Sequence, residues 1–173
     1  PDGQGPGYYR LKRRADNAYF GYVVGPHSWK KYLFPPERRL WQLKRAGQSF
    51  ERTDQPAETQ RYAFIGVRAC EIAALRIQDR VFTGGQFTEP KYAAAREQAF
   101  VVAVNCTQAA DTCFCVSMNT GPEARDGYDL SLTEVLTPGH SFVIQAGSDR
   151  GREVLAAMQT SAATPAHAQA AKA

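Results

Sequence analysis

The pattern that most restricts the fold is a buried strand, two helical stretches and a second buried strand in succession between residues 62 and 105. The apolar run Tyr62–Val67 is rich in aromatic and β-branched residues, which favours a strand. Small or apolar residues then recur at helical spacing at Cys70, Ala73, Ala74, Ile77 and Val81. A second helical stretch, "PKYAAAREQAF", leads into "FVVAVN", the second strand candidate. This order predicts a βαβ crossover and a partly parallel sheet.

The segments before this unit are less regular. "YYRLKRR" and "AYFGYVV" flank the polar turn "ADN" and predict an N-terminal β-hairpin over residues 8–24. Ser28 is placed to cap a short helix that Pro35 and Pro36 would end. The following stretch "GQSFERTDQPAETQ", residues 47–60, is polar and predicts an exposed loop.

The segments after the unit predict a second hairpin and a helix. "YDLSLTEVL" and "SFVIQAG" flank the turn "TPGH", and Ser148 is a plausible cap for a helix in "SDRGREVLAAMQ". The fold class we expect is therefore α/β, with a mixed sheet, a βαβ crossover flanked by helices, and an N-terminal β-hairpin. Residues 1–158 are expected to form a single α/β domain, and the Ala-rich residues 159–173 a tail that is a truncated linker.

Composition restricts the classes of function. No run of about 18 apolar residues is present and the first residues lack the apolar middle of a signal peptide, so we expect no membrane contact and a cytoplasmic location. Residues 1–52 carry 11 Lys and Arg against 4 Asp and Glu, within an overall net charge of +4. Such asymmetry can mark a docking face, but no block of five like charges appears, which favours an ordinary solvated surface. No base-reading motif accompanies the basic residues, so nucleic acid is not an expected partner.

The chain has 4 cysteines, and their positions suggest one shared site. Cys70 and Cys106 each follow a predicted strand, at the sheet edge where α/β proteins build ligand sites. Cys113 and Cys115 lie in a loop that leaves the same edge. The sequence therefore predicts that the four sulfurs converge.

Three chemistries compete for these sulfurs. Structural disulfides are disfavoured in the cytoplasm, and an extended C-x-C pair holds its Cα atoms about 6.6 Å apart, near the limit for a bridge. Zinc accepts four thiolates, but its ribbons normally present C-x2-C or C-x4-C spacing. An iron–sulfur cluster is larger than one ion and suits ligands that stand farther apart. From the residues alone, the expectation is one metal or cluster site.

Four segments together resemble a known family: "YRLKRRADNAYFGYVVGPHSWKKYLFPP", "FIGVRACEIAALRIQDRVF", "AVNCTQAADTCFCVSMNTGP" and "GYDLSLTEVL". They are similar to the β subunit of soluble sulfhydrogenases and to the corresponding subunit of anaerobic sulfite reductase. The resemblance implies an electron-transfer subunit, not an enzyme on its own, that works in a hetero-oligomer. Its partners would be a flavin subunit that handles NAD(P)H and a hydrogenase or sulfite reductase catalytic subunit. The ferredoxin-like dicluster domain typical of the family has no match in this chain.

The resemblance also implies a set of site residues. The family's cysteines fall on Cys70, Cys106, Cys113 and Cys115, as ligands of a [4Fe–4S] cluster. "SMNTGP" would wrap the cluster, with hydrogen bonds from Ser117 and Thr120 and with shielding by Met118. The sequence departs from the family pattern at two positions, with Glu71 in place of an aspartate and Asn119 in place of a glycine. The loop could keep its conformation at Asn119, because asparagine tolerates positive φ better than most residues. Arg68 is a candidate to offset the negative charge of the cluster, although an arginine in such a place is more often a surface residue. The alternative function is a non-redox binding module stabilised by zinc.

Overall fold

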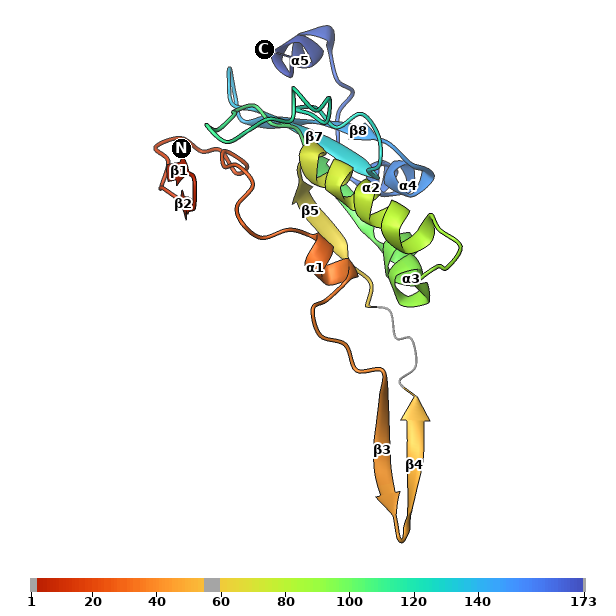
Figure 1. Ribbon diagram of the computed structural model, residues 1–173. Helices are drawn as coiled ribbons and strands as arrows, with labels where there is room; N and C mark the ends of the chain where they lie inside the picture. The colour runs from red at the N-terminus through yellow and green to blue at the C-terminus, as the bar shows by residue number, and fades with distance from the viewer. Residues whose placement is uncertain (1–2, 55–59, 173) are drawn as a thin grey trace.

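A mixed four-stranded sheet forms the centre of the computed structural model, which describes residues 3–54 and 60–172 (Figure 1). Its strands, in spatial order, are β5 (Ala63–Val67), β6 (Phe100–Val104), β7 (Leu130–Val135) and β8 (Ser141–Ala146). The first two neighbouring pairs are parallel and the last is antiparallel. The predicted α/β class, the partly parallel sheet and the C-terminal hairpin are therefore confirmed.

Two helices make the crossover from β5 to β6, as predicted. Helix α2 (Ala69–Thr83) begins directly after β5, and the Glu71 carboxylate accepts a hydrogen bond from the Arg68 backbone N–H at 3.1 Å. Helix α3 (Pro90–Gln98) begins with a proline, and the Glu89 carboxylate accepts from the Tyr92 backbone N–H. Both helices thus satisfy backbone donors at their first turns, which is what fixes where they start.

The core lies between the sheet and these helices. Ala69, Ile72 and Leu75 supply the buried side of α2. The side that the helical spacing singled out in the sequence is partly open instead, because Ile77 is 62% and Val81 67% exposed. The other members of the core are Leu33, Phe64, Val67, Tyr92, Ala95, Ala99, Val101, Ala103 and Ala124.

The segment before the sheet packs on this core through a short helix. The N-cap of helix α1 (Lys30–Leu33) is Trp29, without a side-chain cap, so the predicted cap at Ser28 is wrong, although the Ser28 hydroxyl accepts a hydrogen bond from the Lys30 N–H at 3.4 Å. Leu33 is fully buried, and the Trp29 ring lies 5.2 Å from the Phe64 ring, centroid to centroid. Trp29 is therefore partly buried and packs against the core.

The N-terminal hairpin predicted over residues 8–24 is wrong in its position. Strand β2 (Tyr8–Arg10) pairs with the earlier β1 (Gly3–Gly5), and residues 18–24 form no strand. The backbone N–H groups of Tyr19 and Phe20 donate instead to the Glu134 carboxylate, at 2.7 and 2.9 Å. The Glu134 side chain therefore accepts the backbone hydrogen bonds that a partner strand would otherwise accept.

The loop predicted over residues 47–60 is also wrong in its first part. Strand β3 (Trp41–Ala46) and strand β4 (Ser49–Asp54) form an antiparallel hairpin that projects away from the sheet (Figure 1). Gly47 has a φ of 65°, which the two-residue turn requires at its first position. Strand β4 was not recognised from the sequence because its residues show no apolar pattern. It is a strand because it pairs with β3. Residues 55–59 of the predicted loop lie outside the described residues.

The C-terminal part contains two helices. Helix α4 (Asp149–Ala157) is capped as predicted, since the Ser148 hydroxyl accepts from the Gly151 N–H at 3.0 Å. The Ala-rich tail contains a further short helix, α5 (Pro165–Ala170), which the sequence did not predict. No helix in the described ranges is long and apolar enough to cross a membrane.

A glycine at the start of α4 gives a stability test. A Cβ placed on Gly151 would lie 1.8 Å from the Asp129 carbonyl oxygen, so Gly151→Ala must displace α4 from the sheet. We expect it to lower the free energy of unfolding by about 3 kcal/mol. Gly139→Ala is the control, because nothing lies within 4 Å of its added Cβ. Equal urea midpoints for the two variants would contradict the packing described here.

Candidate functional site

Two of the four cysteines stand at the same edge of the sheet. Cys70 is the second residue of α2, just after β5, and Cys106 follows β6 by two residues. Because β5 and β6 are hydrogen-bonded neighbours that run parallel, their carboxyl ends meet at one edge. Both side chains are partly buried, and all four cysteines are free.

The loop after β6 carries the other two cysteines. The Thr120 backbone N–H donates to the Cys115 carbonyl at 2.8 Å, and the Ala110 N–H donates to the Cys113 sulfur at 3.4 Å. Gly121 lies directly against Cys115, because an added Cβ would stand 3.1 Å from Cys115 Sγ and 3.4 Å from Ala69 Cβ. The loop therefore folds back onto the first turn of α2, next to Cys70.

The thiols of Cys70 and Cys106 lie close enough to other cysteines for their pKa values to be affected. Burial raises the pKa of Cys70 to about 11, and the proximity of Cys106, Glu71 and Cys115 adds to this. Burial also raises the pKa of Cys106, where Cys115 and Cys113 act in the same direction. Cys106 therefore lies within electrostatic range of each of the other three cysteines.

The gathered thiols do not form a closed ion site. Among the described residues, no group of three or more His, Cys, Asp or Glu side chains is arranged to hold a metal ion. The structure therefore brings the thiols into electrostatic range of one another and leaves their ligand undefined.

Arg68 is the central charged residue of the site. It is only 3% exposed, so the surface interpretation is wrong. Its Nη1 donates to the Val104 and Asn105 carbonyls at 3.3 and 3.1 Å, and its Nη2 donates to the Phe20 and Tyr22 carbonyls at 2.6 and 2.8 Å. Its charge and a hydrogen bond both favour the Cys106 thiolate, which partly opposes the effect of burial on the pKa of that group.

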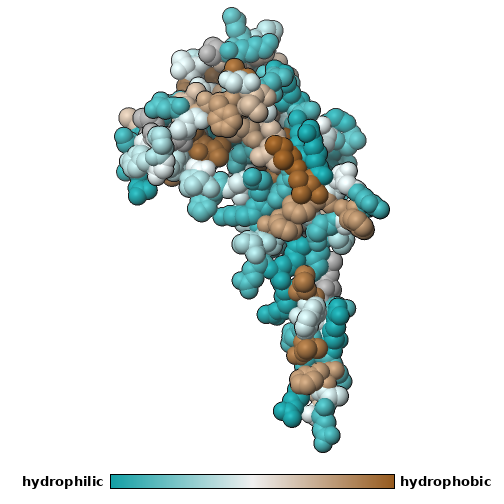
Figure 2. Space-filling model, in the orientation of Figure 1, coloured by the Kyte–Doolittle hydropathy of each residue, from teal (hydrophilic) through white to brown (hydrophobic). Residues whose placement is uncertain are grey.

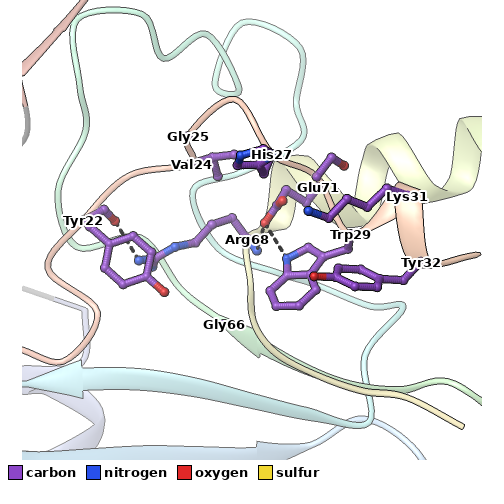
Figure 3. Close-up of a pocket in the computed structure, with 11 residues that line it drawn as sticks. Tyr22, Val24, Gly25, His27, Trp29, Lys31, Tyr32, Gly66, Arg68 and Glu71 are labelled. Atoms are coloured by element: carbon purple, nitrogen blue, oxygen red, sulfur yellow. Dashed lines mark hydrogen bonds between the residues drawn. The ribbon is translucent and has the colours of Figure 1, made fainter. Parts of the chain in front are cut away.

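The Arg68 contacts are completed by Glu71. Figure 3 shows Arg68 reaching Tyr22 on one side, while Glu71 and Trp29 meet on the other side of the same pocket. The Trp29 Nε1 donates to Glu71 Oε2 at 3.1 Å. Burial raises the pKa of Glu71, and hydrogen bonds from Arg68 and Trp29 work against that rise. The aromatic N-terminal segment is thereby fastened to the start of α2.

The remaining predicted site residues differ in their placement. Thr120 supports Cys115, since its hydroxyl lies 3.4 Å from the Cys115 carbonyl oxygen in addition to the backbone bond. Ser117 is exposed on the loop, and Met118 is 62% exposed, so Met118 does not shield the thiols as predicted. Asn119 has a φ of 54°, which confirms that asparagine takes the glycine-like conformation here.

Sequence reasoning missed two residues that shape the site. Asn105 accepts from the Ala124 N–H at 2.9 Å through its side-chain oxygen and donates to the Thr133 hydroxyl at 2.9 Å, which ties the returning loop to the sheet. Gly121 provides the close approach at Cys115. The position of Asn105 directly before a strand-end cysteine was the available signal, and nothing in the sequence marked Gly121.

Comparison of the chain with protein-family models, with curated proteins and with solved structures finds no match.

Removal of the Arg68 guanidinium should destabilise the protein strongly. Arg68→Leu leaves four carbonyl oxygens without their donor, two of them at the end of β6. We expect the free energy of unfolding to fall by more than about 3 kcal/mol, measured by urea denaturation of the reduced, metal-free protein. Arg76→Leu, within α2, removes a partly exposed ion pair with Asp126 of the loop before β7, and it should cost at most about 1 kcal/mol. Similar losses for both variants would refute the anchoring role.

Alkylation rates should rank the thiols. In the reduced, metal-free protein at pH 8, iodoacetamide should modify exposed Cys113 first and Cys70 slowly, because the Cys70 pKa of about 11 keeps it protonated. Since this pKa is raised, Cys70 favours the folded state below pH 9, and that contribution is lost as the pH rises towards 11. Peptide mass spectrometry over a pH series measures both rates. Cys70 reacting as fast as Cys113 at pH 8 would be inconsistent with the burial described.

Proposed function

We propose that this chain is an electron-transfer subunit that carries one [4Fe–4S] cluster. It would link a flavin subunit that handles NAD(P)H to a hydrogenase or sulfite reductase catalytic subunit. The observation that carries the proposal is that Cys70 and Cys106 follow neighbouring parallel strands, while the loop that carries Cys113 and Cys115 packs against the first turn of α2 through Gly121. The resemblance of the segments around these cysteines supplies the class of function.

The donor set fits such a cluster in its chemistry. Four thiols match the all-cysteine ligation of a [4Fe–4S] cluster, and the 4 cysteines of the chain are all accounted for. Gly121 keeps the space beside Cys115 Sγ free of a side chain. Cys70, Cys106, Cys113 and Cys115 would hold the cluster, which supplies one-electron redox chemistry when bound.

The residues around the thiols affect the deprotonation that cluster binding requires. Burial favours neutral thiols, whereas ligation needs thiolates, so binding must release protons. The Arg68 charge favours the thiolate of Cys106 and offsets part of this cost. Ser117 and Thr120 are proposed to donate hydrogen bonds to the sulfurs, for which the Thr120 hydroxyl would turn away from the Cys115 carbonyl that it faces in the structure.

The proposal includes a cellular setting. A cytoplasmic location would keep the thiols reduced, as ligation requires. The chain would work in a hetero-oligomer and would have no catalytic residues of its own.

Anaerobic iron and sulfide analysis tests the function directly. Protein that is purified without oxygen should be brown and should contain about four irons and four acid-labile sulfides per chain. Its dithionite-reduced form should be reoxidised by a one-electron acceptor such as methyl viologen at suitable potential. A colourless protein with one zinc per chain would overturn the proposal and favour the zinc-stabilised binding module.

Loss of one ligand should reduce iron content and stability together. Cys113→Ser should lower bound iron to less than about half and reduce the thermal stability of the loaded protein, because ligation is coupled to folding of the loop. Thr107→Ser, an exposed change in the same loop, should leave both unchanged. Full iron content in Cys113→Ser would remove Cys113 from the ligand set.

A further inference from the structure

The hairpin of β3 and β4 stands apart from the rest of the chain (Figure 1). Eleven of its twelve strand residues are exposed, and only Ala46 is partly covered. Its side chains contact one another: Arg52 Nε donates to Asp54 Oδ1 at 2.7 Å, and the Arg52 guanidinium lies 5.7 Å from the Trp41 ring centre. A lone two-stranded hairpin is marginally stable in water, so this one calls for additional strands.

The apolar side chains of the hairpin share one face. The cross-strand pairs Trp41 with Asp54, Leu43 with Arg52, and Arg45 with Phe50 point to the same side. That face leaves Trp41 48%, Leu43 51% and Phe50 68% exposed. Figure 2 shows apolar groups spaced along the hairpin between hydrophilic ones. Such a face is a candidate for contact with another protein surface.

The turn determines which backbone groups are free. In a hairpin closed by a two-residue turn, the pair next to the turn, here Ala46 and Ser49, is hydrogen-bonded, and the pairs then alternate. Residues of the other pairs point their N–H and C=O groups outwards. The open edge of β3 therefore offers Trp41, Leu43 and Arg45, whereas the open edge of β4 offers Phe50, Arg52 and Asp54.

We infer that two copies of this chain pair through their β3 edges, antiparallel, about a two-fold axis beside Leu43. The two hairpins then form one four-stranded sheet. In this register Leu43 lies opposite Leu43 of the second copy, Trp41 opposite Arg45, and Gln42 opposite Lys44. A tryptophan opposite an arginine is a favourable cation–π pair, and no like charges meet.

Other axes through β3 bring like charges together. The register between the two β3 strands can change only in steps of two residues, each of which moves the axis by one residue. Only then do the outward N–H and C=O groups of the two edges still face each other. An axis beside Lys44 sets Lys44 against its own copy, and an axis beside Gln42 sets Arg45 against Arg39. Like charges directly opposite are destabilising, so Leu43 is the favoured centre.

The β4 edge is less suitable for pairing. Axes beside its middle set Glu51 or Arg52 against its own copy, and axes nearer its ends pair only three strand residues. Charged residues on an outer edge also discourage further strand addition, so assembly would stop at the dimer.

Matched proline variants test the edge. Leu43→Pro and Arg52→Pro each replace an outward N–H, one on β3 and one on β4, while leaving the ladder within the hairpin intact. Sedimentation equilibrium of the full chain should show that wild type is a dimer. We expect the dissociation constant of the dimer to rise at least about 100-fold in Leu43→Pro and to change little in Arg52→Pro. A wild type that stays monomeric at about 100 μM would overturn the inference, as would equal effects of the two prolines.

Charged substitutions of Leu43, the residue at the axis, provide a second test that does not depend on proline, which could disrupt the hairpin itself. Leu43→Lys and Leu43→Glu should each be monomeric alone, because each sets a charge against its own copy. Mixed in equal amounts, they should form a heterodimer that native mass spectrometry resolves from either parent. Homodimers of Leu43→Lys, or no heterodimer in the mixture, would refute pairing about Leu43. Urea midpoints that match wild type would show that the main domain remains folded.

Discussion

A buried guanidinium, that of Arg68, is the interaction on which the rest of the site depends. It joins the end of β6 to the irregular N-terminal segment by donating to four carbonyl oxygens. Burial of a charge is costly unless polar partners surround it, and these carbonyls are those partners. Because Arg68 directly precedes α2 and contacts the residues that lead to Cys106, the same interaction sets the separation between Cys70 and Cys106.

The electrostatics of the thiols shows what the proposed cluster site would require. Cys70 and Cys106 are partly buried next to other cysteines, so each additional negative charge is harder to create there. A protein that must hold several thiolates together therefore needs a compensating positive charge and a ligand that is itself cationic. Arg68 provides the first at Cys106, and the proposed iron–sulfur cluster would provide the second.

The sequence predicted most of the main domain and less of its surroundings. The apolar runs at 62–67 and 100–104 indicate buried strands without any knowledge of the strands they pair with. The βαβ unit could therefore be predicted from the pattern of apolar residues alone. Strand β4 was missed because "SFERTD" has no apolar alternation, and only its pairing with β3 makes it a strand. The N-terminal hairpin was misplaced because Glu134, more than a hundred residues away, satisfies the backbone that was expected to pair locally. The burial of Arg68 was likewise invisible, since its carbonyl partners come from distant segments. The cysteine positions were readable because strand ends in a parallel sheet have a fixed relation to one another.

The central claim is that Cys70 lies in one group with the cysteines of the loop after β6, and thiol bridging tests it most directly. Dibromobimane becomes strongly fluorescent when it links two neighbouring thiols, and it can be applied to the reduced, metal-free protein. The account predicts fluorescent peptides in which Cys70 is joined to Cys106 or Cys115, with which it interacts in the fold. Bridges confined to the loop cysteines, with Cys70 carrying only a single unbridged label, would contradict it.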